Sequence, residues 1–127
     1  MRTWFFSSLA ALALLTTTAA ISNPTAPVTK VSRPFAGAKV NGGTVSMTVT
    51  SGRIVLTLSD EVMDPKTPDP HWQVVDSKGQ VYLLDKMTVK GDRLNKTITL
   101  PAYITSVDKV VIYCAWAEAN LGEAAFQ

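Results

Sequence analysis

The chain has 127 residues, of which 46% are hydrophobic and 17% are charged. This length fits one small domain, and the composition excludes a multi-domain enzyme, a disordered chain and a coiled coil. Twelve Lys and Arg residues against ten Asp and Glu give a formal charge of +2, and neither a basic stripe nor an acidic run stands out. Charge therefore gives no reason to expect nucleic acid or a membrane surface as a partner.

The chain holds one cysteine, Cys114, and one histidine, His71. A single cysteine excludes an intramolecular disulfide, a CxxC redox pair, a zinc knuckle and a c-type haem attachment site. A blue-copper site is excluded as well, because it needs two histidines and neither His nor Met follows Cys114. No catalytic triad, phosphate loop or acid/base pair is evident, so the sequence does not predict an enzyme.

The first twenty residues have the pattern of a secretory signal peptide. Arg2 supplies a positive charge, residues 4–15 form an apolar run broken only by two serines, and small residues follow as far as Ala20. Cleavage after Ala20 or after Ser22 fits this pattern. A retained membrane anchor is the alternative, although the run is short for a spanning helix. We expect a secreted or periplasmic protein with no membrane span after processing.

Residues 21–34 carry three prolines among Ser, Thr and Asn, and are expected to form an extended leader ahead of a single β-rich domain at 35–127. That domain begins with alternating apolar and polar residues over 45–49 and again over 54–58, separated by Ser51-Gly52. The pattern predicts a β-hairpin.

The connection after this hairpin carries four carboxylates, which are Asp60, Glu61, Asp64 and Asp69. Their spacing lacks the pattern of a calcium loop, so they are expected to be solvated. His71 follows a Pro-Asp-Pro segment and precedes Trp72 at the expected start of a strand. It is either a turn-flanking residue that packs beside Trp72 or part of a ligand-binding surface with Asp69 and Trp72.

Two further turns are predicted. Residues 76–79, which end in glycine, separate the apolar runs 72–75 and 81–84, as in a second hairpin. Residues 90–92 lie between 87–89 and the run 97–100. Asn95-Lys96-Thr97 is a formal glycosylation sequon, although its use depends on the host.

The run from Lys109 to Trp116 is the most continuous apolar segment of the domain, and it predicts a central strand buried on both faces. Residues 115–119 are rich in alanine and are also compatible with the start of a short helix. Residues 122–126 are expected to form a last strand. Seven to nine short strands predict an all-β fold, either an antiparallel β-sandwich or a flattened barrel.

Cys114 shares its face of this predicted strand with Val110, Ile112 and Trp116, so its thiol is expected to be sheltered. It is either a small buried hydrophobic residue or a functional thiol, since an unpaired cysteine in an exported protein must be buried, pair between chains or react.

Five segments, taken in order, resemble the DM-thirteen domain, a small β-rich extracytoplasmic domain found beside DOMON domains in Skeletor-like proteins. They are 68–75 (PDPHWQVV), 79–83 (GQVYL), 98–101 (ITLP), 110–114 (VVIYC) and 121–124 (LGEA). The most specific elements are the Pro-Asp pair, the Leu-Pro pair and the cysteine that ends its strand shortly before a Gly-x-Ala strand. The resemblance covers residues 35–126.

This resemblance implies an electron-transfer domain in which the cysteine acts in redox chemistry, as a bare thiol or as a ligand to a prosthetic group such as haem. Cys114 would hold that role here, and Asp69 matches the aspartate of the Pro-Asp pair. A redox partner protein or a bound prosthetic group is then expected. The alternative is a non-catalytic binding or adhesion module with a structural cysteine, in which Asp69, His71, Trp72 and Trp116 meet the ligand.

Overall fold

The computed structural model describes residues 27–91 and 93–127. The predicted signal peptide at 1–20, residues 21–26 of the expected leader and Asp92 of the third predicted turn lie outside the described residues. The described strands are β1 (Val28–Val31), β2 (Val45–Thr50), β3 (Arg53–Leu58), β4 (Pro70–Val75), β5 (Val81–Lys86), β6 (Val89–Lys90), β7 (Arg93–Leu94), β8 (Thr97–Thr99), β9 (Lys109–Cys114) and β10 (Ala119–Ala125).

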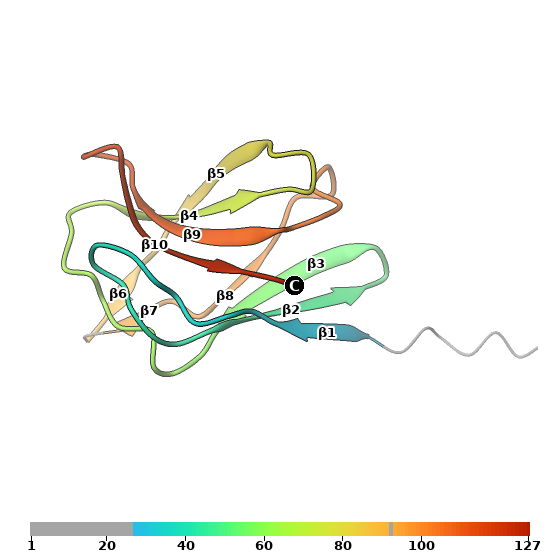
Figure 1. Ribbon diagram of the computed structural model, residues 1–127, viewed down its shortest axis with the longest axis horizontal. Coiled ribbons are helices and arrows are strands. Elements are labelled where there is room, and N and C mark those ends of the chain that lie inside the picture. The colour runs from blue at the N-terminus through green and yellow to red at the C-terminus, as the bar shows by residue number, and fades with distance from the viewer. Residues whose placement is uncertain (1–26, 92) are drawn as a thin grey trace, which may run out of the picture.

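Two antiparallel sheets of four strands form the domain. Their strand orders are β1-β2-β3-β8 and β10-β9-β4-β5, while β6 and β7 pair as a separate ribbon. Figure 1 shows the two sheets as two layers. The sheets are not closed on each other, so the predicted all-β fold is confirmed as a sandwich rather than a barrel. No helix occurs within residues 27–91 and 93–127.

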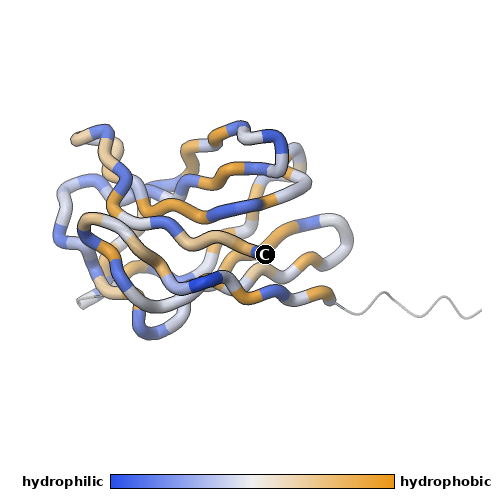
Figure 2. The backbone as a smooth tube through the Cα atoms, viewed as in Figure 1, coloured by the Kyte–Doolittle hydropathy of each residue, from blue (hydrophilic) through white to orange (hydrophobic). Residues whose placement is uncertain are grey.

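The hydrophobic core lies between the sheets. Figure 2 shows hydrophobic and hydrophilic residues alternating along the strands, as expected where one face of each strand is buried. The first sheet contributes Val45, Ile54, Leu56, Leu58 and Ile98, and the second contributes Trp72, Val74, Val110, Ile112, Cys114, Leu121 and Ala124. Burial of these side chains, at roughly 1.5 to 3 kcal/mol each for the larger ones, is the main stabilising contribution.

The first two predicted hairpins are confirmed. β2 and β3 are joined by Ser51 and Gly52, both with positive φ, as a two-residue hairpin turn requires. β4 and β5 are joined by a turn in which the Asp76 carboxylate accepts hydrogen bonds from the amides of Gln80 (2.8 Å) and Lys78 (2.9 Å). These hydrogen bonds, of which the one from Gln80 has the largest effect, hold the pKa of Asp76 below its ordinary value, although partial burial opposes the shift.

The third turn joins different strands from those expected. Gly91 has a positive φ and lies between β6 and β7, whose pairing covers two residues on each side. The run 97–100, expected to follow this turn directly, supplies β8, which crosses to the first sheet and pairs with β3. The chain therefore changes sheets between β7 and β8.

The prediction of a central strand after residue 109 is confirmed. β9 lies between β10 and β4, and Val110, Val111, Ile112 and Cys114 are all buried. The strand ends at Cys114, two residues before the predicted end. Residues 115–118 form a turn instead of a helix, because β10 begins at Ala119 directly opposite Cys114 and leaves only four residues for the connection. The predicted last strand is present and begins earlier, at Ala119.

Val28–Val31, placed by sequence in the extended leader, forms β1 and pairs with β2 along its whole length. The chain then crosses to the second sheet, since the amide of Ser32 donates to the carbonyl of Val45 and the amide of Arg33 donates to that of Ala125. β1 is thus an edge strand of the sandwich whose four residues are all exposed.

Candidate functional site

Cys114 lies at the end of β9 on the inner face of the second sheet. Its side chain is 1% exposed and belongs to the hydrophobic core, and its backbone lies between Pro70 of β4 and Ala119 of β10. His71 is paired instead with Tyr113, one residue earlier, so the imidazole and the thiol lie on opposite faces of the sheet. The only histidine of the chain is therefore not positioned to activate the thiol.

Trp72 also points into the core and is fully buried. Its indole Nε1 has no hydrogen-bond partner among the residues that the structure describes. A ligand cannot reach Trp72 or Cys114 without displacing core side chains. Two of the five residues singled out by sequence are thus part of the packed interior.

Asp69 and His71 come together with a residue that sequence reasoning did not single out, Lys86 at the end of β5. Asp69 Oδ1 lies 3.0 Å from His71 Nε2 and 3.4 Å from Lys86 Nζ. Burial by itself raises the pKa of Asp69, but the hydrogen bonds and positive charges of its two partners outweigh this, and the pKa falls below its ordinary value. The carboxylate is therefore held ionised by its neighbours.

His71 is fixed at both ring nitrogens, because Nδ1 also lies 2.8 Å from the carbonyl oxygen of Leu84. A neutral imidazole carries one N–H and can donate to only one of these acceptors, whereas the imidazolium donates to both. This cluster ties the start of β4 to the end of β5, next to the irregular pairing between His71 and Gln73. The geometry accounts for a structural role without any ligand.

Trp116 lies in the turn between β9 and β10 and is 77% exposed. The expectation that it shares a strand face with Cys114 is wrong, because the strand ends before it. The turn is attached to the start of β4 by a hydrogen bond from the Ala115 amide to the Asp69 carbonyl (3.0 Å). Asp69, His71 and the Trp116 turn are therefore neighbours at one end of the second sheet.

The carboxylates of the long connection are not gathered into a site. Asp60 forms an ion pair with Lys96, and Asp64 accepts a hydrogen bond from the Lys66 amide (2.9 Å). Within residues 27–91 and 93–127 there is no group of three or more His, Cys, Asp or Glu side chains that could hold a metal ion. The same part of the chain contains no helix with the length and apolar character needed to cross a membrane.

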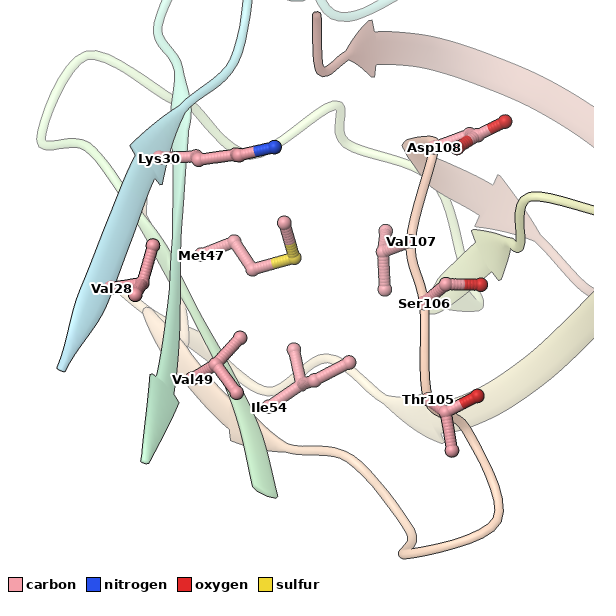
Figure 3. A pocket seen from close by; sticks show the side chains of 9 residues that line it. All are labelled: Val28, Lys30, Met47, Val49, Ile54, Thr105, Ser106, Val107 and Asp108. Carbon is pink, nitrogen blue, oxygen red and sulfur yellow. The ribbon is translucent and has the colours of Figure 1, made fainter. Parts of the chain in front are cut away.

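A different feature, which sequence reasoning missed, is an opening of about 300 Å³ at the side of the sandwich, which we call the intersheet opening. It is lined by Val28, Lys30, Met47, Val49, Ile54, Thr105, Ser106, Val107 and Asp108. Figure 3 shows one wall formed by β1, β2 and β3 and the other by the segment 105–108 that leads into β9. Its volume is at the lower end of the range of ligand sites in proteins.

Strand register explains why apolar side chains line this opening. Val28 pairs with Val49, and Val49 pairs with Ile54, so the three form one row across the first sheet. Residues directly opposite each other in antiparallel strands point to the same face, and Ile54 is in the core. The row therefore lies on the inner face, and it extends from the buried Ile54 to Val28, which is 55% exposed.

The opposite wall is attached to the second sheet. The amide of Asp108 donates to the carbonyl of Val75 (2.8 Å), and Ser106 Oγ is hydrogen-bonded to the Ser77 hydroxyl (2.9 Å) and amide (3.1 Å). Val107, between these anchors, is buried and faces the opening. One wall is thus a sheet and the other is a segment hydrogen-bonded to β4 and to the β4–β5 turn, and the opening reaches core side chains on each side.

Comparison of the chain with protein-family models, with curated proteins and with solved structures finds no match in any of the three. The resemblance to the DM-thirteen domain therefore has no support beyond the segments that suggested it.

Proposed function

We propose that this protein is a non-catalytic binding module that takes an apolar group of its ligand into the intersheet opening. The observation that carries the proposal is the continuous apolar row from Val28 to Ile54, opposite Val107, which links solvent to the hydrophobic core. A largely apolar concavity with few polar groups is the usual form of a small-molecule site. The exposed apolar surface at Val28 and Val49 has no covering segment among the described residues.

The opening suits a short hydrocarbon chain better than a large planar ring system such as haem. Its volume of about 300 Å³ accommodates only a small group, and one side remains open to solvent. Haem is much larger than this, so the opening does not supply the prosthetic-group site that the DM-thirteen resemblance implies. A linear chain that enters between Met47 and Val107 would extend the core outward.

We expect n-octanol to bind in this opening and to shift the backbone amide resonances of Val49, Ile54 and Val107 in NMR spectra. Each methylene buried contributes about 0.8 kcal/mol, so n-hexanol should bind roughly tenfold or more weakly than n-octanol. Val49→Trp, which adds a large side chain at the mouth, should abolish the shifts. Val81→Trp is the control, because Val81 is also an exposed strand valine but lies on β5 and does not line the opening.

Saturable binding that responds to chain length and is lost only in Val49→Trp would support the proposal. Shifts spread over the whole surface, or equal shifts in both tryptophan variants, would contradict it.

The redox hypothesis centred on Cys114 is the second candidate, and a substitution separates it from the binding module. Cys114→Ala leaves a small void and should cost about 1 kcal/mol or slightly more, while Cys114→Ser buries a hydroxyl and should cost roughly 1 to 3 kcal/mol. We expect both variants to remain folded and to keep octanol binding. The measurements are urea unfolding and the octanol titration.

Visible absorbance after reconstitution with haem tests the alternative. If the natural protein gains a stoichiometric haem spectrum that a folded Cys114→Ala variant lacks, the thiol is a ligand and the redox hypothesis is supported. A Tyr113→Phe variant serves as the control on the opposite face of β9.

A further inference from the structure

Lys30 occupies an unusual position for a charged residue. It pairs with Met47, which pairs with Leu56, which in turn pairs with Ile98. Leu56 and Ile98 belong to the core, so this row lies on the inner face of the first sheet. Lys30 therefore projects from the edge strand toward the interior side of the sandwich, at the rim of the intersheet opening.

No carboxylate within residues 27–91 and 93–127 forms an ion pair with Lys30. Figure 3 shows its ammonium group extended across the mouth of the opening, above Met47. Asp108, on the opposite rim, turns its carboxylate away from the opening. The remaining polar groups of the lining are the hydroxyls of Thr105 and Ser106. The charge presented to an occupant is thus positive.

We infer that the ligand is an anionic amphiphile, with a short hydrocarbon chain between the sheets and a carboxylate or similar anionic head group at Lys30. This inference rests on the proposed function, since it assigns the head group of the same ligand. The apolar row Val28–Val49–Ile54 would hold the chain, and the Lys30 ammonium at the rim would hold the anion. An ammonium group can bind anions of several shapes. The geometry therefore favours a negatively charged head group without specifying which one.

Edge protection is the competing explanation of Lys30. Inward-pointing charges on edge strands discourage edge-to-edge pairing with the strand of another molecule, and β1 is an edge strand. Under that explanation the charge of a ligand is irrelevant to its affinity. The two explanations therefore differ in a measurable quantity, which is the preference of the opening for one sign of head group.

The experiment compares octanoate, n-octanol and octylammonium, which share a chain of eight carbons and differ in head-group charge. Dissociation constants at pH 7 and low salt are taken from the NMR shifts of Ile54 and Val107. We expect octanoate to bind about three- to tenfold more tightly than octylammonium, as a partly exposed charge pair allows. Lys30→Met should bring the two within about twofold, and Lys78→Met, on the β4–β5 turn, should leave the preference unchanged.

Two further measurements guard against misfolding or association of Lys30→Met. Lys30→Gln should give the same loss of preference, and added salt should reduce the preference in the natural protein because it screens exposed charges. If n-octanol binds and octanoate shows no advantage over octylammonium, the anionic head group is wrong and the binding module stands. If none of the three binds, the proposed function fails as well.

Discussion

Replacing Trp72 by alanine should remove about 3 to 5 kcal/mol from the free energy of unfolding, which is roughly a fifth or more of the total for a domain of this size. The indole is fully buried between the sheets, in the central strand β4, where it packs against neighbours from both layers. Truncation leaves a cavity that the surrounding strands cannot close. Urea unfolding followed by far-ultraviolet circular dichroism measures the loss, because this signal comes mainly from the backbone and remains available when the buried tryptophan is removed.

Trp116→Ala is the matched control for this experiment. The same chemical change at a side chain that is 77% exposed should alter stability by less than about 0.5 kcal/mol. Trp72→Phe adds a finer comparison: it retains a ring and removes the buried Nε1, which has no partner among the described residues. Its cost should stay below about 2 kcal/mol. A Trp72→Ala variant as stable as Trp116→Ala would mean that the core is not packed as described.

The all-β fold could be predicted because local signals along the chain agree with one another. Alternation over 45–49 and 54–58 specified which face of the first hairpin is buried, and Ser51-Gly52 specified its turn. The apolar run after Lys109 predicted a central strand buried on both faces. β9 lies between two strands, and its side chains are buried on one face at Val110 and Ile112 and on the other at Val111. Each of these inferences used residues within one hairpin or one strand.

Long-range pairing could not be predicted in the same way. The prolines in 21–34 indicated an extended segment. An edge strand is also an extended segment, but nothing in the local sequence shows that Val28–Val31 pairs with β2. The pairing of β8 with β3 likewise depends on tertiary packing, because it places Ile98 on the buried face of the first sheet. Strand partners are chosen by tertiary packing, which local sequence does not encode.

The candidate site illustrates the same limit. Cys114 and Trp72 were both candidate site residues, and the structure places both in the core. For Cys114 this confirms the sheltered position that its apolar strand neighbours predicted. The intersheet opening is made of common residues from three separate segments, so no motif marks it. One signal was available in the Val-Thr-Lys-Val segment. Its lysine, Lys30, lies opposite Met47 and therefore on the same face of the sheet as the apolar residues of the first hairpin. Recognising it requires the register of β1 against β2.

β10 is an edge strand of the second sheet, and the segment 36–40 covers this edge. Gly122 makes the contact possible. Ala36 forms a bridge with Glu123, and the amides of Lys39 and Val40 both donate to the carbonyl of Leu121. A Cβ atom at Gly122 would lie 2.7 Å from the carbonyl oxygen of Val40 and 2.8 Å from its Cβ. Such contacts are too short to be tolerated, so one side of the contact has to shift. We expect the covering segment to shift, because it is joined to β10 by fewer hydrogen bonds than β9 is.

Gly122→Ala should therefore cost about 1 to 3 kcal/mol, the range for overpacked sites, and should lift residues 36–40 from the edge of β10. Hydrogen exchange at the amides of Lys39 and Val40 should accelerate, since those amides lose their acceptor. Gly52→Ala is the comparison, because Gly52 has a positive φ but open space around it, so its cost is backbone strain alone and exchange at Lys39 should not change. Unchanged exchange at both amides in Gly122→Ala would show that the sandwich relaxes elsewhere and that the covering segment is not held by this close approach.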